Sequence, residues 1–486
     1  MRKATEIMDR MTPKIGVLLI ATGRFRAMGG DTAEGFYELR KQREAEEYLE
    51  GIAQAGRPVY SGNVYTREDL ERQMEQFRQE KVDCVFALFL SWTEDFVWVR
   101  FLRDMSPIPI LFAARTRERI SFGETYAETD FVEFLCAGGL VGSLEASGSI
   151  ARFRRPMMET VIGTFRQIME RLKPFAAASA LRSALRQTSF GLLASYNEIM
   201  WSTYVDPYLL FAQAGPELRF LSVATLAREI EAVPEARVKE IHDRLTRSYE
   251  VLPDVDEEKF LASIRASAAL EDTARNAGVS ALILNDVDTV LLTEVGLRPG
   301  FIPVPGGPGD ITIVPEGDIG GGLITHVLRL LSGRPVNFIE PFHIDLPNGF
   351  FSGGHAGPND YTDPRGSVKI ARDVRFAKTA YKYAGAPFAW YTIPEGRKTM
   401  AHISQSAAGG FKLACGLVDA LPTEHQITSY THGSFRPVDT DLQTFFGRLI
   451  RTGVTQHYGV VEGDYTAQLR DLASIMGMEF VYLNDR

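Results

Sequence analysis

The stretch KIGVLLIAT, which runs from Lys14 to Thr22, is a near-continuous series of apolar residues. Such a series is typical of a strand that is buried on both faces, as in a parallel sheet covered by helices. Similar runs follow at 82–90 and 108–113, and the polar segment 67–80 places its apolar residues on one stripe, as a surface helix does. The first third of the chain therefore predicts a parallel α/β sheet.

A second α/β region is expected after a long helical segment, and the last third of the chain has a different pattern. The expected elements are the long helix at 157–185, strands at 190–195 and 281–285, and helices at 235–249, 257–277 and 320–331. From Pro335 onward, short extended runs are separated by Gly and Pro, which predicts an antiparallel sheet or barrel. These runs are 336–339, 368–371, 388–392, 400–404 and 426–430.

The expected fold class is α/β, with two doubly wound, Rossmann-like parallel-sheet domains followed by a mostly antiparallel β domain. Because the chain has 486 residues, about three domains are expected, at roughly 150 residues each. The expected domains are 1–175, 176–330 and 331–486.

Composition argues against several classes of function. The net charge is −9 and the basic residues are spread along the chain, so no nucleic-acid surface is expected. No apolar segment approaches the ~18 residues that a membrane helix needs, and no signal peptide is visible. Cys84, Cys136 and Cys415 are far apart, which favours reduced thiols over disulfides or a thiolate zinc site. We therefore expect a cytoplasmic protein that binds neither nucleic acid nor membrane.

Four side chains in the last third suggest a metal site. They are Glu316 in Val-Pro-Glu-Gly-Asp, Glu340 in Asn-Phe-Ile-Glu-Pro, His355 in Gly-Gly-His-Ala-Gly and His457 in Thr-Gln-His-Tyr. Two carboxylates and two imidazoles suit a divalent cation of the manganese or cobalt type. The same carboxylates could move protons on a substrate that the cation holds.

Each of these residues also has a structural explanation. Glu316 lies near an expected helix start, where an acidic residue can cap free N–H groups. Glu340 could be an exposed residue of an edge strand, and the two histidines could be a loop residue and a structural residue. Two other histidines of this region could supply outer hydrogen bonds instead, namely His343 and His432.

The ordered set resembles the L-arabinose isomerase family, within the wider L-fucose/L-arabinose isomerase group, and the likeness spans most of the chain. In that family a Glu in a Glu-Gly-Asp segment, a Glu on the next strand, a His shortly after it and a His near the C-terminus bind Mn²⁺. Glu316, Glu340, His355 and His457 match these residues in order. The resemblance implies Mn²⁺, or another divalent cation such as Co²⁺ or Mg²⁺. It also implies aldose–ketose isomerisation through a cis-enediol, with Glu316 and Glu340 as the catalytic residues in roles that the sequence leaves open.

The resemblance further implies a homo-oligomer built from trimers, a hexamer or a tetramer, whose site lies at a subunit interface under the N-terminal domain of a neighbour. That domain departs from the family pattern, because Ala137 precedes Gly138-Gly139 where the family has a histidine. Substrate-binding roles are expected for Arg24 in the loop after the first strand, for Trp92, and for Asn285 at the end of the strand 281–285. The expected substrate is a monosaccharide other than, or besides, L-arabinose.

Two alternatives remain open from the sequence. The same metal and carboxylates could epimerise a sugar or a sugar acid through a related enolate. A non-catalytic sugar-binding protein could also use an α/β scaffold. Such a protein has no need for two carboxylates on one metal, which favours the isomerase.

Overall fold

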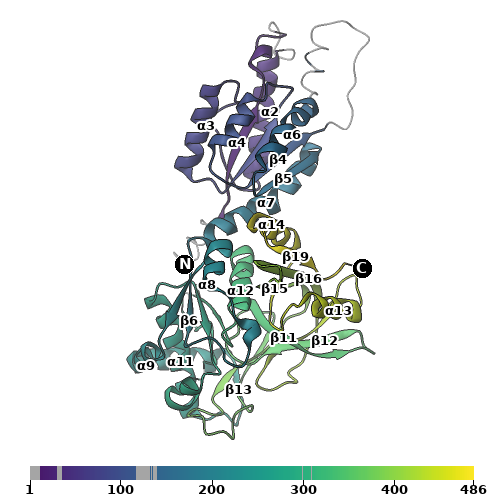
Figure 1. The fold of residues 1–486 in the computed structure, drawn as a ribbon. Helices are drawn as coiled ribbons and strands as arrows, with labels where there is room; N and C mark the ends of the chain where they lie inside the picture. The colour runs from purple at the N-terminus through teal and green to yellow at the C-terminus, as the bar shows by residue number, and fades with distance from the viewer. Residues whose placement is uncertain are drawn as a thin grey trace. The chain divides into compact units, whose positions relative to one another are not determined.

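The computed structural model describes residues 11–29, 36–116, 132, 134, 139–297, 299–307 and 309–485 (Figure 1). These described residues group into two compact units. The first unit consists of residues 11–183 with 474–477, and the second of residues 184–473 with 478–485. None of the helices in these ranges has the length and apolar character that crossing a bilayer requires.

The described residues of the first unit form a five-stranded parallel sheet in the order β2-β1-β3-β4-β5. Its strands are β1 (Lys14–Ile20), β2 (Arg57–Val59), β3 (Cys84–Phe89), β4 (Ile110–Arg115) and β5 (Met158–Gly163), and its helices are α2 (Tyr37–Ala53), α3 (Arg67–Glu80), α4 (Phe96–Asp104), α6 (Gly139–Phe153) and α7 (Phe165–Leu185). All six residues of β3 are buried, as are six of the seven in β1. The prediction of a parallel sheet from three apolar runs is thus confirmed.

The prediction of one continuous helix over 157–185 is wrong. Residues Met158–Gly163 form β5, which pairs with β4 in parallel, and α7 begins only at Phe165. The three β-branched residues Thr160, Val161 and Ile162 favour an extended edge strand, in which only alternate side chains need burial. The expected domain boundary at 175/176 falls inside α7.

The second unit contains a parallel sheet and, packed against it, a larger β sheet. The parallel sheet has four strands among the described residues, in the order β10-β9-β6-β7. Its strands are β6 (Ser189–Leu193), β7 (Glu217–Leu221), β9 (Ala281–Leu284) and β10 (Thr312–Val314), and the main helices that accompany it are α9 (Val223–Ala232), α10 (Glu235–Ser248), α11 (Glu257–Asn276) and α12 (Ile319–Ser332). The expected elements at 190–195, 235–249, 257–277, 281–285 and 320–331 agree with these bounds to within two residues.

The larger sheet has ten strands within the described ranges, in the order β19-β16-β15-β18-β11-β12-β17-β14-β13-β8. An additional antiparallel pairing of β16 with β17 closes the six strands from β16 to β17 into a barrel. The strands are β8 (Glu250–Val251), β11 (Val336–Asp345), β12 (Phe350–His355), β13 (Ser367–Arg372), β14 (Pro387–Thr392), β15 (Gly396–Gln405), β16 (Phe411–Leu421), β17 (Thr431–Pro437), β18 (Tyr458–Glu462) and β19 (Glu479–Tyr482), joined by helices α13 (Leu442–Thr452) and α14 (Thr466–Met476). The predicted antiparallel sheet or barrel is confirmed.

The extended run expected at 426–430 is wrong, because β17 begins only at Thr431. The preceding residues form a turn in which Ser429 adopts a left-handed backbone with φ of 73°. Such a conformation cannot continue a strand. The turn ends at Tyr430, which directly precedes β17.

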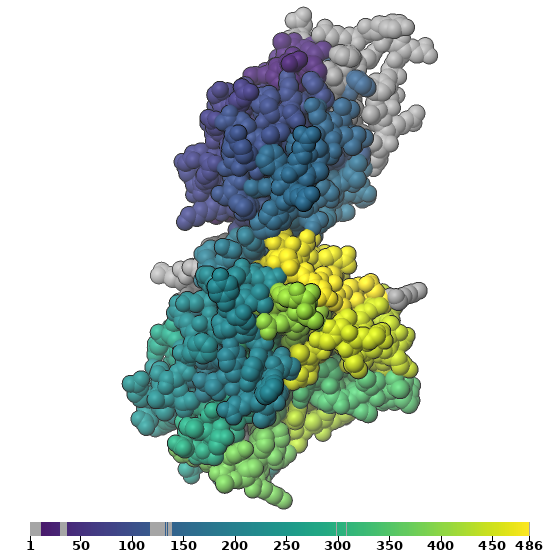
Figure 2. Space-filling model, viewed as in Figure 1, coloured from purple at the N-terminus to yellow at the C-terminus, as the bar shows by residue number. Residues whose placement is uncertain are grey.

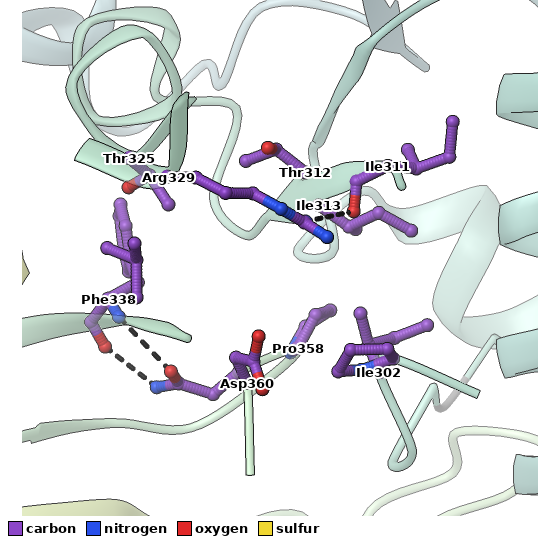
Figure 3. A pocket seen from close by; sticks show the side chains of 12 residues that line it. Ile302, Ile311, Thr312, Ile313, Thr325, Arg329, Phe338, Pro358 and Asp360 are labelled. Carbon is purple, nitrogen blue, oxygen red and sulfur yellow. Dashed lines mark hydrogen bonds between the residues drawn. The ribbon is translucent and has the colours of Figure 1, made fainter. Parts of the chain in front are cut away.

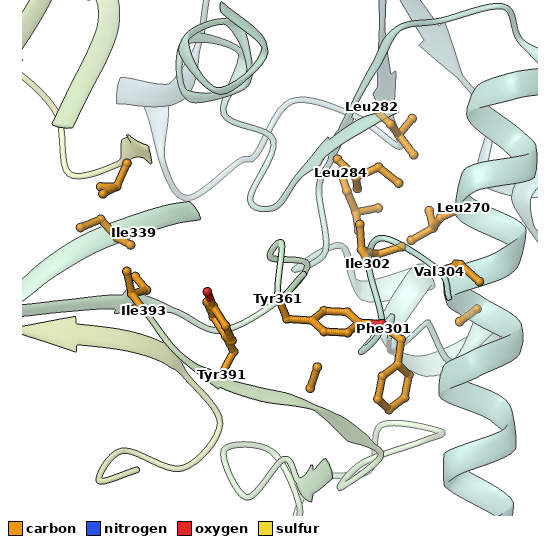
Figure 4. Close-up of a cluster of buried hydrophobic side chains, with 14 of the residues drawn as sticks. Leu270, Leu282, Leu284, Phe301, Ile302, Val304, Ile339, Tyr361, Tyr391 and Ile393 are labelled. Atoms are coloured by element: carbon orange, nitrogen blue, oxygen red, sulfur yellow. The ribbon is translucent and has the colours of Figure 1, made fainter. Parts of the chain in front are cut away.

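The parallel sheet and the barrel share one hydrophobic core. Leu282 and Leu284 of β9 belong to the same buried cluster as Ile339 of β11 and Tyr391 of β14 (Figure 4). The side chains of the central and C-terminal residues also meet along the visible face of this unit (Figure 2). A common core explains why both sheets form one compact unit. The expected boundary at 330/331 lies inside α12, which packs on strands of both sheets.

The first turn of α12 lies unusually close to the barrel. A Cβ atom on Gly320 would lie 2.1 Å from the carbonyl oxygen of Ile403 in β15, and one on Gly322 would lie 2.1 Å from the side chain of Ile283 in β9. Only residues without side chains fit here. The glycines therefore bring the N-terminus of α12 between the two sheets, and the loop that enters this helix carries Glu316.

Both described cysteines are buried free thiols. They are Cys84 in β3 and Cys415 in β16. Cys136 lies outside the described residues, as do Ala137 and Gly138.

Candidate metal centre

Three of the four expected ligands come together in the second unit. Glu316 lies between β10 and α12, His355 is the last residue of β12, and His457 directly precedes β18. One ligand atom from each of the three lies within 4.8 Å of the other two. The strand β11 runs between β12 and β18, and the ring of its residue Phe338 lies 5.0 Å from that of His355 and 4.8 Å from that of His457.

Both imidazoles direct a nitrogen toward the Glu316 carboxylate. Nε2 of His457 lies 3.0 Å from Oε2, and Nε2 of His355 lies 3.5 Å from Oε1. The histidines are 0% and 2% exposed, respectively, and among the described residues neither Nε2 atom has a partner in hydrogen-bonding geometry. Buried polar atoms without partners are rare and costly. A divalent cation between the three side chains would satisfy both nitrogens, so the residues fit a metal.

Asp318 orients His457. Its Oδ2 lies 2.9 Å from Nδ1 of His457, while its Oδ1 accepts the backbone N–H of Gly321 at 2.9 Å as the N-cap of α12. A carboxylate on Nδ1 keeps the proton there and leaves the lone pair of Nε2 free for a metal, as in many metal sites. The capping role that Glu316 could have had belongs to Asp318.

The backbone at Glu316 is strained and is held from both sides. Glu316 has a φ of 64°, in the left-handed region that non-glycine residues rarely occupy. Its N–H donates to Oδ1 of Asp286 at 2.8 Å, and its carbonyl accepts from Nδ2 of Asn197 at 2.9 Å. Such a conformation costs of order 1–3 kcal/mol and occurs preferentially at functional sites.

The surroundings of the centre lower the pKa of one of its groups and raise the pKa values of two others. Burial opposes ionisation of Glu316, but the two histidines against it outweigh burial and lower its pKa below the usual range. Burial also disfavours the charged form of His457, yet Asp318 and Glu316 raise its pKa to about 9. Burial and the nearby Glu316 charge raise the pKa of Asp286. Glu316 therefore stays ionised, and the carboxylates around His457 favour a positive charge at this point.

Glu340 lies beside the triad but is not one of the three clustered residues. It is half-buried on β11, where it pairs with Gly354, the neighbour of His355. It is two residues from Phe338, so both side chains lie on the same face of β11. The role of Glu340 as fourth ligand remains a prediction.

The expected substrate-binding residues lie in both units. Asn285 is 3% exposed in the second unit, with Nδ2 3.4 Å from the Ser195 hydroxyl and Oδ1 lacking a hydrogen-bond partner among the described residues. Arg24 and Trp92 belong to the first unit, after the neighbouring strands β1 and β3. Nε of Arg24 lies 2.7 Å from Oε1 of Glu94. Their substrate-binding roles remain predictions.

The two histidines considered as alternatives lie outside the triad. His343 is exposed on β11. His432 is buried, but Nδ1 lies 2.9 Å from the carbonyl of Tyr430 and Nε2 accepts the backbone N–H of Gln426 at 3.3 Å. Its nitrogens are thus occupied by the backbone of the turn before β17.

A small cavity is lined in part by Phe338, whose ring lies beside both histidines. It is lined by Arg329, whose guanidinium donates to the carbonyl of Ile311 at 2.7 Å, and by Asp360 (Figure 3). The side chain of Asn359 pairs with both the N–H and the carbonyl of Phe338. The cavity volume of about 20 Å³ holds about one water molecule, so it cannot admit a sugar. Its polar lining instead fixes the strand that supports both histidines.

Sequence reasoning missed several residues that shape the centre. Asp286 directly follows the expected strand 281–285, and Asp318 stands in the quoted Glu-Gly-Asp segment, so both had a local signal. Asn197 and Phe338 had none, since their roles depend on contacts across the fold.

Comparison with protein-family models finds no match to this chain, and comparison with curated protein sequences finds none either.

Proposed function

We propose that this protein is a metal-dependent aldose–ketose isomerase that acts through a cis-enediol on a monosaccharide other than, or besides, L-arabinose. The observation that carries the proposal is the buried group of Glu316, His355 and His457, whose unpaired Nε2 atoms face one carboxylate. The sequence resemblance supplies the reaction, and the group supplies a place for the cation that this reaction uses.

Glu316, His355 and His457 would hold the cation, with Glu340 as the fourth ligand. A mixed set of carboxylate and imidazole donors suits Mn²⁺, and also Co²⁺ or Mg²⁺. Bound there, the cation would polarise the substrate carbonyl and stabilise the negative charge of the enediolate.

The chain supplies the groups that move protons. Isomerisation removes a proton from the carbon beside the carbonyl and returns one to the neighbouring carbon, which requires a positioned base and acid. We assign this work to Glu316 and Glu340, with their individual roles open. Asp286, which follows β9 and accepts the N–H of Glu316, is a third carboxyl group close to Glu316, and its raised pKa suits it to hold a proton there.

The remaining parts of the proposal come from the resemblance. The protein would be a cytoplasmic homo-oligomer, a hexamer or tetramer built from trimers, with its site at a subunit interface. Arg24, Trp92 and Asn285 would contact the sugar. We also propose that the two parallel sheets have the doubly wound, Rossmann-like arrangement.

The test is a panel of aldoses and ketoses incubated with metal-free protein, with and without added Mn²⁺. One sugar should be converted to its isomer only with the cation, and Glu316→Gln should abolish the conversion. Glu395→Gln, which changes an exposed carboxylate, should leave it intact. Normal Mn²⁺ stoichiometry in a variant with both Glu316→Ala and Glu340→Ala would contradict the site assignment. Conversion that is independent of metal would contradict the mechanism.

A further inference from the structure

The guanidinium group of Arg375 and the phenol group of Tyr430 lie near the candidate metal centre. Neither has a role in the isomerisation proposed above. Tyr430 immediately precedes β17, whose first residue Thr431 pairs with the proposed ligand His355. The guanidinium carbon of Arg375 lies 5.9 Å from the centre of the Tyr430 ring and 4.7 Å from that of Phe376. At these distances both aromatic rings attract the guanidinium charge.

The two segments that carry these residues are tied together. Ser429, in its left-handed conformation, accepts the backbone N–H of Val374 through its hydroxyl at 2.8 Å. The chain after β13 is therefore fixed to the turn before β17. Arg375 and Tyr430 thus lie on two connected segments, and Tyr430 leads directly into the strand that pairs with His355.

Arg375 and Tyr430 lie within electrostatic range of the proposed catalytic carboxylates. Burial raises the pKa of Tyr430, Arg375 lowers it, and Glu340 and Glu316 raise it further. Arg375 also stabilises the ionised form of Asp286. Arg375 is therefore a positive charge within electrostatic range of these carboxylates.

Arg375 has donors available for a ligand. Within the described part of the chain, Asp373 is the one acidic residue in ion-pair range, and its Oδ2 lies 3.5 Å from Nη2, which is long for a strong charge-assisted bond. The Arg375 side chain is 28% exposed. A guanidinium carries five N–H donors in a planar fork that matches carboxylate and phosphate oxygens.

Resting on the isomerase function above, we propose that Arg375, assisted by the Tyr430 hydroxyl, binds an oxyanion of the substrate, a carboxylate or phosphate on a carbon away from the reacting pair. The substrate class is then acidic sugars, either sugar acids or sugar phosphates. A neutral sugar has no need of a guanidinium beside the metal centre, whereas an acidic sugar carries an oxyanion that the fork of guanidinium donors matches.

Binding of inert analogues tests this inference without relying on turnover. Ribitol and arabinitol, their 5-phosphates and the corresponding pentonates have no carbonyl that can isomerise. Each is titrated calorimetrically into the full-length protein, with and without Mn²⁺. The native protein should bind at least one acidic analogue about tenfold or more tightly than its neutral counterpart, because a charge-assisted bidentate contact contributes that much.

Variants then locate the contact. Arg375→Ala should weaken the acidic analogue by about 10- to 100-fold and the neutral one by less than about threefold. Arg375→Lys should restore part of the loss, since it keeps the charge without the fork, and Tyr430→Phe should lose less than Arg375→Ala. Lys378→Ala removes an exposed charge from the same segment and should change nothing. Thermal unfolding and Mn²⁺ stoichiometry check that each variant is folded.

The outcomes separate the two proposals. Arg375-dependent binding of acidic analogues supports the inference even if no sugar is isomerised, and phosphates and pentonates reveal which oxyanion is preferred. If the acidic analogues bind no more tightly than the neutral ones, or if Arg375→Ala weakens both equally, the inference is overturned. Turnover of neutral sugars that is unchanged in Arg375→Ala would then leave the isomerase function standing alone.

Discussion

Replacing Asp318 by Asn should damage the metal centre more than replacing it by Ala. In the native protein, one oxygen of Asp318 accepts the Gly321 N–H and the other faces Nδ1 of His457, both at 2.9 Å. In the Asp318→Asn variant the new amide oxygen must stay on the Gly321 N–H, so the amide NH₂ faces His457. Nδ1 then has to accept, the imidazole proton moves to Nε2, and Nε2 loses the lone pair that the cation needs.

The magnitude follows from this exchange of tautomers. Loss of an outer-shell partner typically weakens metal binding by about 10- to 100-fold, or about 1.4–2.7 kcal/mol. Asp318→Asn should lie at the upper end, because it holds His457 in the wrong tautomer. Asp318→Ala leaves the tautomer free and should lie near the lower end.

Folding stability should show the reverse order. Asn caps a helix about as well as Asp, so Asp318→Asn should keep the cap of α12, whereas Asp318→Ala should lose about 1 kcal/mol of unfolding free energy. Mn²⁺ affinity is measured by titration with detection of free Mn²⁺, and stability by urea unfolding of the metal-free protein. A result in which Asp318→Ala binds Mn²⁺ more weakly than Asp318→Asn would refute the tautomer argument.

Three further predictions concern the scaffold of the centre. Gly320→Ala should lower the unfolding free energy by about 1–3 kcal/mol, because its methyl group meets a backbone carbonyl of β15; Gly148→Ala, in a helix with open space around it, should cost nothing in the same urea titration. His326 is buried with a pKa lowered to about 3 from 6.5, so the unfolded chain takes up its proton first as pH falls. The unfolding free energy should therefore fall by about 3 kcal/mol between about pH 6.5 and pH 4, because His326 stays neutral in the folded protein. His326→Asn should flatten this part of the curve of unfolding free energy against pH. An unchanged slope in the variant would contradict the lowered pKa of His326. Asn359→Leu leaves the N–H and carbonyl of Phe338 unpaired and should cost about 2 kcal/mol or more in chemical unfolding, with a cost near zero pointing to water taking over these bonds.

The parts of the fold that the sequence predicted are those in which burial follows a local pattern. β1 and β3 are almost wholly apolar and wholly parallel, so a short run of residues was sufficient to identify them. The prediction for 157–185 failed because β5 is an edge strand with few buried residues, so it lacks the apolar run that identifies β1 and β3. The turn before β17 failed because nothing nearby in the sequence indicates the left-handed Ser429.

The metal centre was predictable only through residue types with strong chemical preferences. His355 and His457 stood out because, with Glu316 and Glu340, they form an ordered set of two imidazoles and two carboxylates that suits a divalent cation. The supports of these residues were invisible, since the hydrogen bonds of Asn359 to the backbone of Phe338 join segments that are 21 residues apart in the chain. Arg375 and Tyr430 were likewise hidden, because their contact depends on a turn that local propensity does not indicate.

If the proposed ligands hold a cation, the position of β18 in the barrel sets the time at which it can be captured during synthesis. β18 lies between β15 and β11, and 139 residues separate Asp318 from the histidine that precedes this strand. A nascent chain that ends just before His457 has therefore presented Glu316 and His355 with a barrel that lacks β18 and the third proposed ligand. Nascent chains that end before His457 should not bind Mn²⁺. Binding should begin once β18 has joined the barrel between β15 and β11.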